Sequence, residues 1–253
     1  MKHAALALPA LLLFATHPRA EVFKEDFSEG LDPKRWMISA WVAPHNGPKN
    51  KAEFRRDHVT VVNGLLQLKL TQTKTEGGVA SVGGEITSQR KFGYGTYEFE
   101  MKGSSTEEDP KGTNGKSVSG SITGAFLYLP DSRTEIDIEY EGVPSRAHIT
   151  QTSTWIDDKK PYEQFKVPIG NIHSYWPHQR FHKYKWVWLP DKVQFFRDGE
   201  LISTHTKVVP KEPAPFMFNH WGTNSRDWGG LATTDVVRYV YIKSFSFTSL
   251  DKR

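Results

Sequence analysis

The sequence contains no cysteine and no Asn-X-Ser/Thr glycosylation sequon. Without cysteine there is no disulfide framework, so stability must come from a buried apolar core, which a chain of 253 residues can supply. A hydrophobic content of 37% and a charged content of 25% are those of an ordinary globular protein. The two absences are compatible with a bacterial export route.

The sequence also lacks an apolar run long enough to span a membrane. The longest run extends from Ala4 to Ala15, whereas a spanning helix needs roughly 20 apolar residues. It follows the basic residue Lys2 and precedes a small residue, Ala20, as in secretory signals. We therefore predict that residues 1–20 are a signal peptide and that the protein is secreted or periplasmic, with no membrane contact after cleavage. The alternatives are an uncleaved anchor and a buried helix.

A large excess of one charge is missing as well. The formal net charge is +4, but Lys2 and Arg19 fall in the predicted signal peptide, which leaves 31 Lys and Arg residues against 29 Asp and Glu. Nucleic-acid-binding domains carry a basic patch or a strongly basic net charge. Nucleic acid is therefore not an expected partner.

No segment after residue 20 shows the apolar periodicity of a long helix. From Val59 onward the chain instead alternates apolar and polar residues in short runs, such as GYGTYEFEMK and HKYKWVWLPD. Asn63-Gly64 and Asp198-Gly199 are turn signals that join hairpin strands. This pattern predicts one all-β domain over residues 21–253, either a two-sheet sandwich or a barrel, with a surface loop from Gly103 to Ser121.

Several catalytic signatures are absent from the sequence. No Gly-X-Ser-X-Gly elbow and no phosphate-binding loop occurs, and the ten histidines show no tight ligand spacing. We accordingly predict no catalytic metal.

One predicted strand, TEIDIEYEG, concentrates acidic residues on one face. Alternation places its apolar residues on the core side and Glu135, Asp137, Glu139 and Glu141 on the other. An amphipathic surface strand is one interpretation, although like charges on one face repel one another. Coordination of a hard cation is another, although an extended strand disperses ligands. The third is glycoside hydrolysis.

A retaining glycosidase needs two carboxyl groups about 5–5.5 Å apart, one as nucleophile and one as acid and base. Four strand residues rise about 13 Å, so Glu135 and Glu139 would have to lean together on a concave, twisted sheet. Asp137 between them could share a hydrogen bond with one neighbour and separate the proton affinities of the two glutamates.

These residues resemble the active-site strand of glycoside hydrolase family 16. The resemblance continues in FKEDFSEGLDPKRW, GGEITSQRKFGYGTYEFEMK, FHKYKWVWLPDKVQFFRDGELI and PFMFNHWGTNSRDWGG, in the family's order. It implies a jelly-roll β-sandwich of two antiparallel sheets with a concave substrate cleft, and retaining cleavage of β-linked polysaccharides. It further implies that Glu135 is the nucleophile, Asp137 its helper and Glu139 the acid and base.

The resemblance also implies substrate-binding residues and a substrate branch. The substrate-binding candidates are Glu85, Gln151, Trp155, Asn219, Trp221 and Trp228. The single residue between Asp137 and Glu139 is similar to the spacing in lichenases and xyloglucan-active enzymes. Mixed-linkage β-1,3-1,4-glucan is therefore the expected substrate. Glu141 and the absence of a tryptophan just before Glu135 depart from the lichenase pattern.

We thus expect a monomeric, secreted endo-β-glucanase whose partner is its polysaccharide substrate. The resemblance implies no required cofactor and leaves room for a structural calcium ion. Two alternatives remain open at this point. One is a transglycosylase that passes a glucan or xyloglucan segment to another sugar, and the other is a non-catalytic polysaccharide-binding module.

Overall fold

The computed structural model describes residues 20–43, 49–157, 162–169 and 176–250. Apart from Ala20, the predicted signal peptide lies outside the described residues. Among the residues that are described, no helix is long and apolar enough to cross a membrane.

Seventeen β-strands and two 3₁₀ turns make up the regular structure of the described chain. The 3₁₀ turns are η1 (Arg56–His58) and η2 (Pro130–Ser132). The strands are β1 (Val22–Glu25), β2 (Trp36–Ile38), β3 (Val42–Ala43), β4 (Asn50–Phe54), β5 (Val59–Val62), β6 (Leu65–Thr75), β7 (Gly78–Phe92), β8 (Gly95–Ser105), β9 (Ser121–Leu129), β10 (Thr134–Glu141), β11 (Ile149–Trp155), β12 (Tyr162–Pro168), β13 (His182–Leu189), β14 (Lys192–Arg197), β15 (Glu200–His205), β16 (Ala214–Gly222) and β17 (Arg238–Ser249).

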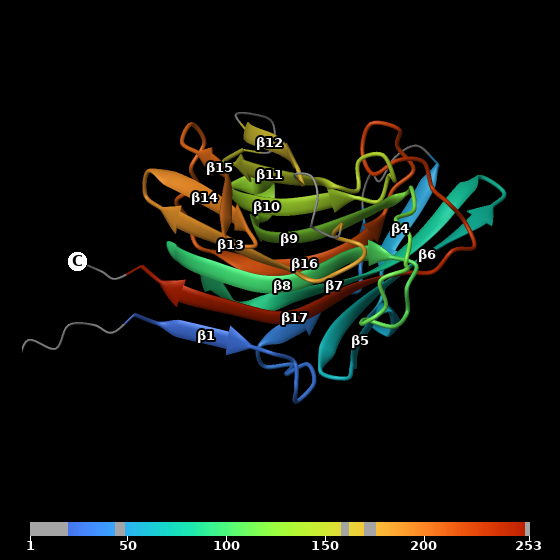
Figure 1. The fold of residues 1–253 in the computed structure, drawn as a ribbon, viewed down its shortest axis with the longest axis horizontal. Helices are drawn as coiled ribbons and strands as arrows, with labels where there is room; N and C mark the ends of the chain where they lie inside the picture. Colours follow the sequence, from blue (N-terminus) through green and yellow to red (C-terminus); the bar gives the residue numbers. More distant parts are fainter. Residues whose placement is uncertain (1–19, 44–48, 158–161, 170–175, 251–253) are drawn as a thin grey trace, which may run out of the picture.

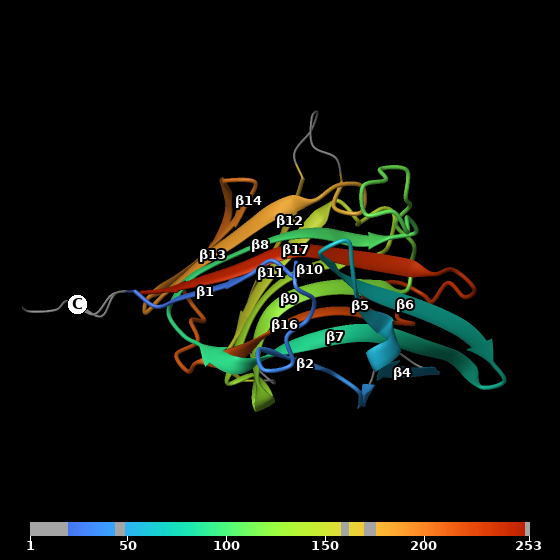
Figure 2. The same cartoon turned by 90° about the horizontal axis from the view of Figure 1, so that it is seen from below.

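The strands form two curved antiparallel layers, visible from two sides in Figures 1 and 2. The inner layer runs β2–β7–β16–β9–β10–β11–β12. The outer layer runs β5–β6–β17–β8–β13–β14–β15, with β1 also paired to β17. The layers join where β6 pairs with β7. The predicted jelly-roll sandwich of two antiparallel sheets is therefore confirmed.

The core lies between the layers and is dominated by aromatic rings. Strand alternation sends Tyr97 of β8, Trp186 of β13 and Phe216 of β16 into it, and none of the three is solvent-exposed. Tyr97 and Trp186 stack with centroids 5.1 Å apart. Each such ring removes roughly 150–250 Å² from water. This burial supplies the stability for which the chain has no disulfide.

The two predicted hairpin turns are confirmed. Asn63-Gly64 joins β5 to β6 with φ of 53° and 73°, and Asp198-Gly199 joins β14 to β15 with φ of 51° and 89°. Two successive positive φ values match the right-handed twist of the paired strands, which explains why Asn-Gly and Asp-Gly occur there.

The predicted surface loop from Gly103 to Ser121 is shorter in the structure, because β8 continues to Ser105 and β9 begins at Ser121. The buried Lys102 holds the loop by donating to the carbonyl oxygen of Gly112 at 2.6 Å. Arg238, also buried, donates to the carbonyl oxygen of Ser119 at 3.1 Å. Two buried cationic side chains therefore anchor the loop, an arrangement that its polar composition did not indicate.

Candidate active site

The alternation predicted for the acidic strand is present in β10. Ile136, Ile138 and Tyr140 are buried in the core. Glu135, Asp137 and Glu139 line a cleft of about 420 Å³ on the concave face of the inner layer. The cleft is also lined by Trp41, Phe54, Glu85, Phe126, Tyr128, Met217, Asn219 and Trp221.

Strand register arranges the cleft in rows that cross the inner layer. One row contains Glu139, flanked by Gly124 of β9 and Gln151 of β11. It continues through Asn219 to Glu85 on one side and to Lys166 on the other. The row of Glu135 contains Tyr128, Trp155 and Tyr162. Side chains of one row share a face, so an extended ligand lying across the strands can contact several of them.

Asp137 is the most enclosed of the three acids, with 3% of its surface exposed. Ser153 on β11 donates its hydroxyl to Asp137 Oδ2 at 2.8 Å, and the side chain of Trp155 also donates to the carboxyl group. Burial, followed by the charges of Glu135 and Glu139, holds the pKa of Asp137 well above its ordinary value. Both of these donors lie on β11.

Glu139 opens partly to the cleft but is closely surrounded by protein atoms. Burial and, second, the charge of Glu135 raise its pKa to about 8. Gln151 Nε2 donates to Glu139 Oε2 at 3.1 Å and acts in the opposite direction. A carboxyl group in this environment keeps its proton at neutral pH and can donate it.

Glu85 lies at the far end of the Glu139 row and is 2% exposed. Ser39 Oγ donates to it at 2.6 Å, Asn219 Nδ2 donates at 3.3 Å, and the side chain of Trp41 is a further donor. Burial raises the pKa of Glu85. Glu85 is thus a fixed wall of the cleft, not a solvated surface acid.

The structure brings most of the predicted substrate-binding residues together. Glu85, Asn219 and Trp221 line the cleft, and Gln151 contacts Glu139. Trp155 stacks on Tyr162 with centroids 4.3 Å apart and an interplanar angle of 20°. Trp228 is not among the described residues that line the cleft. It lies in the loop between β16 and β17, one residue before Gly229.

Sequence reasoning missed Trp41, Tyr128 and Ser153. Tyr128 could have been found, because the alternation of GAFLYLP places Gly124, Phe126 and Tyr128 on one strand face. Trp41 comes from a distant part of the chain, and no pattern in the sequence connects it to Glu85.

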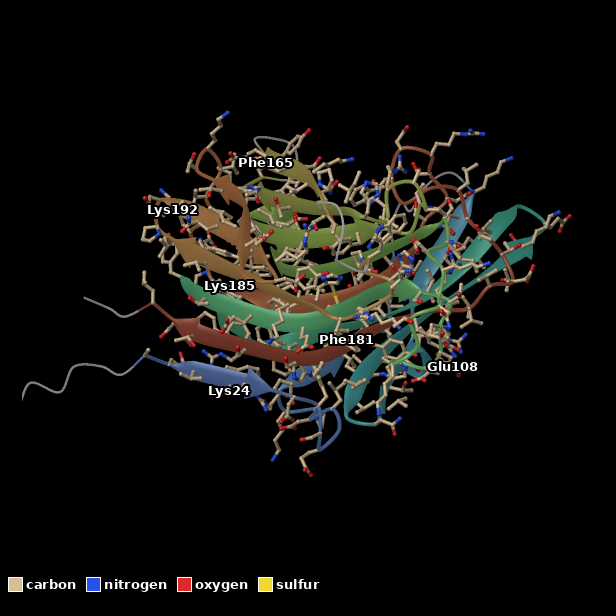
Figure 3. The ribbon with its side chains drawn as sticks, in the orientation of Figure 1. Lys24, Glu108, Phe165, Phe181, Lys185 and Lys192 are labelled. Atoms are coloured by element: carbon tan, nitrogen blue, oxygen red, sulfur yellow. The ribbon has the colours of Figure 1, made fainter. Side chains whose placement is uncertain are left out.

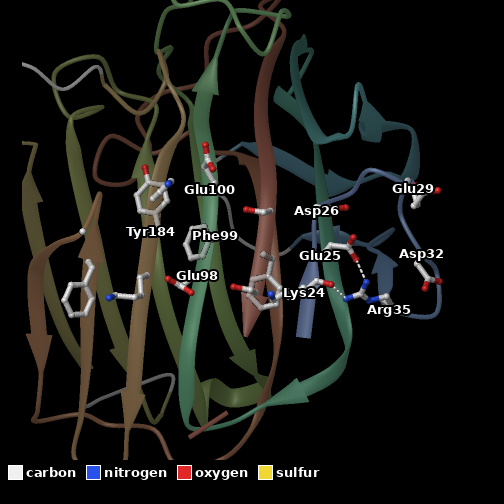
Figure 4. Close-up of a pocket in the computed structure, with 18 residues that line it drawn as sticks. Lys24, Glu25, Asp26, Glu29, Asp32, Arg35, Glu98, Phe99, Glu100 and Tyr184 are labelled. Carbon is white, nitrogen blue, oxygen red and sulfur yellow. Dashed lines mark hydrogen bonds and ion pairs between the residues drawn. The ribbon is translucent and has the colours of Figure 1, made fainter. Parts of the chain in front are cut away.

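A second, larger hollow of about 790 Å³ lies on the outer layer. Figure 3 labels Lys24 and Lys185, two of the residues that line it, and Figure 4 shows the lining in close-up. Lys183 faces Glu100 and Lys185 faces Glu98 on neighbouring strands, and Arg35 pairs with Glu25 at 3.1 Å. Cross-strand pairs of opposite charge are typical of a solvent-facing sheet. The enclosed carboxyl groups of the concave cleft make that cleft the candidate active site.

No group of three or more His, Cys, Asp or Glu residues that could hold a metal ion occurs in the part of the chain that the structure describes. His220 is fully buried between the carbonyl oxygen of Leu68 and the hydroxyl of Ser104. Burial lowers the pKa of His220 to about 3, so this side chain is neutral and structural.

Comparison with known proteins identifies related sequences and structures. A family profile described as Glycosyl hydrolases family 16 matches residues 46–238. The chain is similar to the endo-1,3-1,4-beta-glycanase ExoK of Rhizobium meliloti, with 26% identity over 90% of this chain and 78% of that protein. A beta-glucanase of Acetivibrio thermocellus is 28% identical over 85% of this chain, which spans 60% of that protein's length. Among solved structures, a Bacillus licheniformis beta-glucanase superposes with a TM-score of 0.74 at 22% identity, covering 90% of this chain and 98% of the other. At this identity the superposition supports the fold alone.

Proposed function

The chain belongs to glycosyl hydrolases family 16 and is a glycoside hydrolase, and from this premise we propose that it is a secreted, retaining endo-β-glucanase that cleaves mixed-linkage β-1,3-1,4-glucan. The observation that carries the proposal is the placement of three carboxyl groups of one strand in a concave cleft, one of them with a pKa raised to about 8.

In the proposed reaction Glu135 attacks the anomeric carbon while Glu139 donates its proton to the oxygen of the scissile bond. The bond between that carbon and the leaving oxygen breaks, and a covalent glycosyl-enzyme forms on Glu135. Glu139, now a carboxylate, then takes a proton from water, which attacks the same carbon and releases Glu135. The two displacements return the original anomeric configuration.

Asp137 supports this division of roles by its position, because the hydrogen bonds from Ser153 and Trp155 fix it between the two glutamates.

The cross-strand rows favour a glucan that lies across the strands. Glu85, Asn219 and Trp221 would bind sugar units on one side of the scissile bond, and Gln151 and Trp155 on the other. Exposed indole rings suit the flat C–H faces of pyranose sugars. Trp41, 46% exposed beside Glu85, offers a further ring at the first of these ends.

Mixed linkage is proposed on two grounds. A single residue separates Asp137 and Glu139, as in the lichenase-like branch. In addition, the Rhizobium meliloti relative is named an endo-1,3-1,4-beta-glycanase.

A polysaccharide panel tests the proposal. Barley glucan, lichenan, laminarin, xyloglucan and agarose are incubated with the enzyme, and products are sized and reducing ends counted. We expect new reducing ends and short oligosaccharides from barley glucan and lichenan, with none from agarose. Longer products without new reducing ends would instead indicate a transglycosylase. Full activity in Glu135→Ala would disprove the assigned nucleophile.

A further inference from the structure

Glu141 continues the acidic face of β10 past the three proposed catalytic residues and is 7% exposed. Its carboxylate contacts Arg146 at 2.7 Å and Lys166 at 3.8 Å, and it accepts the backbone N–H of Gly229 at 2.8 Å. These three partners come from three separate segments: Arg146 from the β10–β11 loop, Lys166 from β12 and the backbone of Gly229 from the β16–β17 loop. An acidic surface strand would not need this arrangement.

The contact with Gly229 fastens the loop between β16 and β17 to the end of β10. Gly229 and Gly230 have φ of 70° and 85°, a conformation that favours glycine. A Cβ on Gly229 would lie 2.1 Å from Thr223 Cγ2. The carbonyl oxygen of Gly229 accepts from Gly120 N at 2.8 Å. Both the backbone N–H and the carbonyl oxygen of Gly229 are therefore hydrogen-bonded, and they hold the loop that carries Trp228.

One of the two cations, Lys166, also lies close to Glu139. Lys166 on β12 belongs to the cross-strand row of Glu139, with only Gln151 between them. Its side chain is 48% exposed, and its flexible stem allows the ammonium group to approach either glutamate. An ion pair between Lys166 and Glu139 would favour loss of the proton that Glu139 must donate.

We propose that Glu141 is a positioning residue of the active site, which fastens the β16–β17 loop to β10 and, together with Arg146, holds Lys166 away from Glu139. This inference rests on the proposed role of Glu139 as the proton donor. As a consequence, Glu141 keeps the proton on Glu139 over a wider pH range.

The charged groups around Glu139 come from three strands. Glu135, Asp137 and Glu141 face it from β10, Lys166 faces it from β12, and Glu85 of β7 lines the same cleft. The charge of Glu141 contributes to the raised pKa of Glu139, and Lys166 acts in the opposite direction. The intervening residues of β9, β11 and β16 are uncharged: Gly124, Gln151 and Asn219.

The test measures the pH dependence of kcat/KM on barley glucan for Glu141→Gln, Arg146→Met and the double variant Glu141→Gln/Lys166→Met. Glutamine keeps an oxygen for the Gly229 N–H but removes the charge. We expect the alkaline limb of Glu141→Gln to move to lower pH, and the double variant to return toward the wild-type limb. Arg146→Met removes one of the two cations that compensate the negative charge of Glu141. The alkaline limb of this variant should therefore move to higher pH.

Glu163→Gln is the matched control. Glu163 on β12 also fastens a loop, by accepting the backbone N–H groups of Thr206 at 3.0 Å and Lys207 at 2.8 Å, but it does not line the cleft. It should lower the melting temperature without moving the pH limb.

Limbs of Glu141→Gln and Arg146→Met that match wild type, or that move in the same direction, would overturn the role of Glu141. If Glu141→Gln does not fold, Arg146→Met alone decides by the direction of its limb. Wild-type activity in Glu139→Gln would instead overturn the proposed function.

Discussion

Glu135 and Glu139 are identical side chains four residues apart, so only their surroundings can give them different roles. Around Glu139 these surroundings are burial, the charge of Glu135 and a hydrogen bond from Gln151. Burial has the largest effect and raises the pKa of Glu139 to about 8. Glu139 can therefore donate a proton at pH 7, where an ordinary glutamic acid is ionised.

Glu139→Gln should lower kcat on barley glucan by about 10²–10⁴-fold, because a sugar leaving group needs a proton donor. The loss should be much smaller on an activated aryl β-glucoside oligomer, whose phenolate leaves without protonation. Steady-state kinetics on both substrates check this. Equal losses on both would show that Glu139 is not the acid.

The pH profile of the wild-type enzyme provides a separate prediction at the same residue. Activity should fall as the pH rises through about 8, because Glu139 then loses the proton it must donate. A kcat/KM profile on barley glucan from pH 5 to 10 measures this limb. An alkaline limb that persists unchanged in the residual activity of Glu139→Gln would assign it to another group.

The same raised pKa has a cost for stability. The folded state keeps a proton on Glu139 that the unfolded chain releases near its ordinary pKa of 4.5, so the free energy of unfolding falls as the pH rises from about 4.5 to 8. The Glu139→Gln variant has no carboxyl group at this position, so its free energy of unfolding does not fall in this way. Its melting temperature should exceed that of wild type by an amount that grows over this range, at about 2–4 °C per kcal/mol. A difference that is constant with pH would contradict the assignment.

At the scale of the element, β9 leaves room beside Glu139, because its residue in this row is a glycine. Gly124 lies between Glu139 and Asn219, and a Cβ at this position would be 2.6 Å from Asn219 Oδ1. Its absence leaves Asn219 free to bond Glu85 at 3.3 Å. The strand therefore contributes to the site by a missing side chain.

Gly124→Ala should displace Asn219 and lower kcat/KM on barley glucan by about tenfold, which corresponds to about 1.4 kcal/mol. Gly199→Ala is the matched control, because a Cβ there meets no atom within 4 Å and the β14–β15 turn lies away from the cleft. With φ of 89°, Gly199→Ala should cost about 1 kcal/mol of stability and leave kinetics unchanged. Wild-type kinetics in Gly124→Ala would disprove this role of β9.

At the scale of the whole molecule, the sequence was sufficient to predict many of the strands from Val59 onward, the two hairpins and the acidic face of β10, but not the strands β1 to β4. The predicted features follow from alternation and turn chemistry, which are local. The hydrogen-bond donors to Glu85 could not be predicted in this way. Ser39, Trp41 and Asn219 come from two distant segments of the chain and meet only in the folded sheet. Glu141 stood out as a departure from the lichenase pattern, but its role depends on Arg146, Lys166 and Gly229, whose convergence no spacing indicates.

The predicted signal peptide gives a testable prediction. The protein recovered from the periplasm or medium should begin near Glu21, as measured by intact mass and N-terminal sequencing. Recovery of the chain with residues 1–20 still attached, in the membrane fraction, would favour an uncleaved anchor.

The place of β17 constrains when folding can finish. This last strand is the centre of the outer layer, paired with β8 on one edge and with β6 and β1 on the other. A growing chain that has not yet reached β17 therefore lacks an interior strand of the outer layer, and β1 lacks its partner β17. Contacts between such distant parts of a chain form slowly. The pairing of β17 with β1, β6 and β8 is therefore a late step in folding, because the chain must be made as far as Ser249 before the outer layer can close.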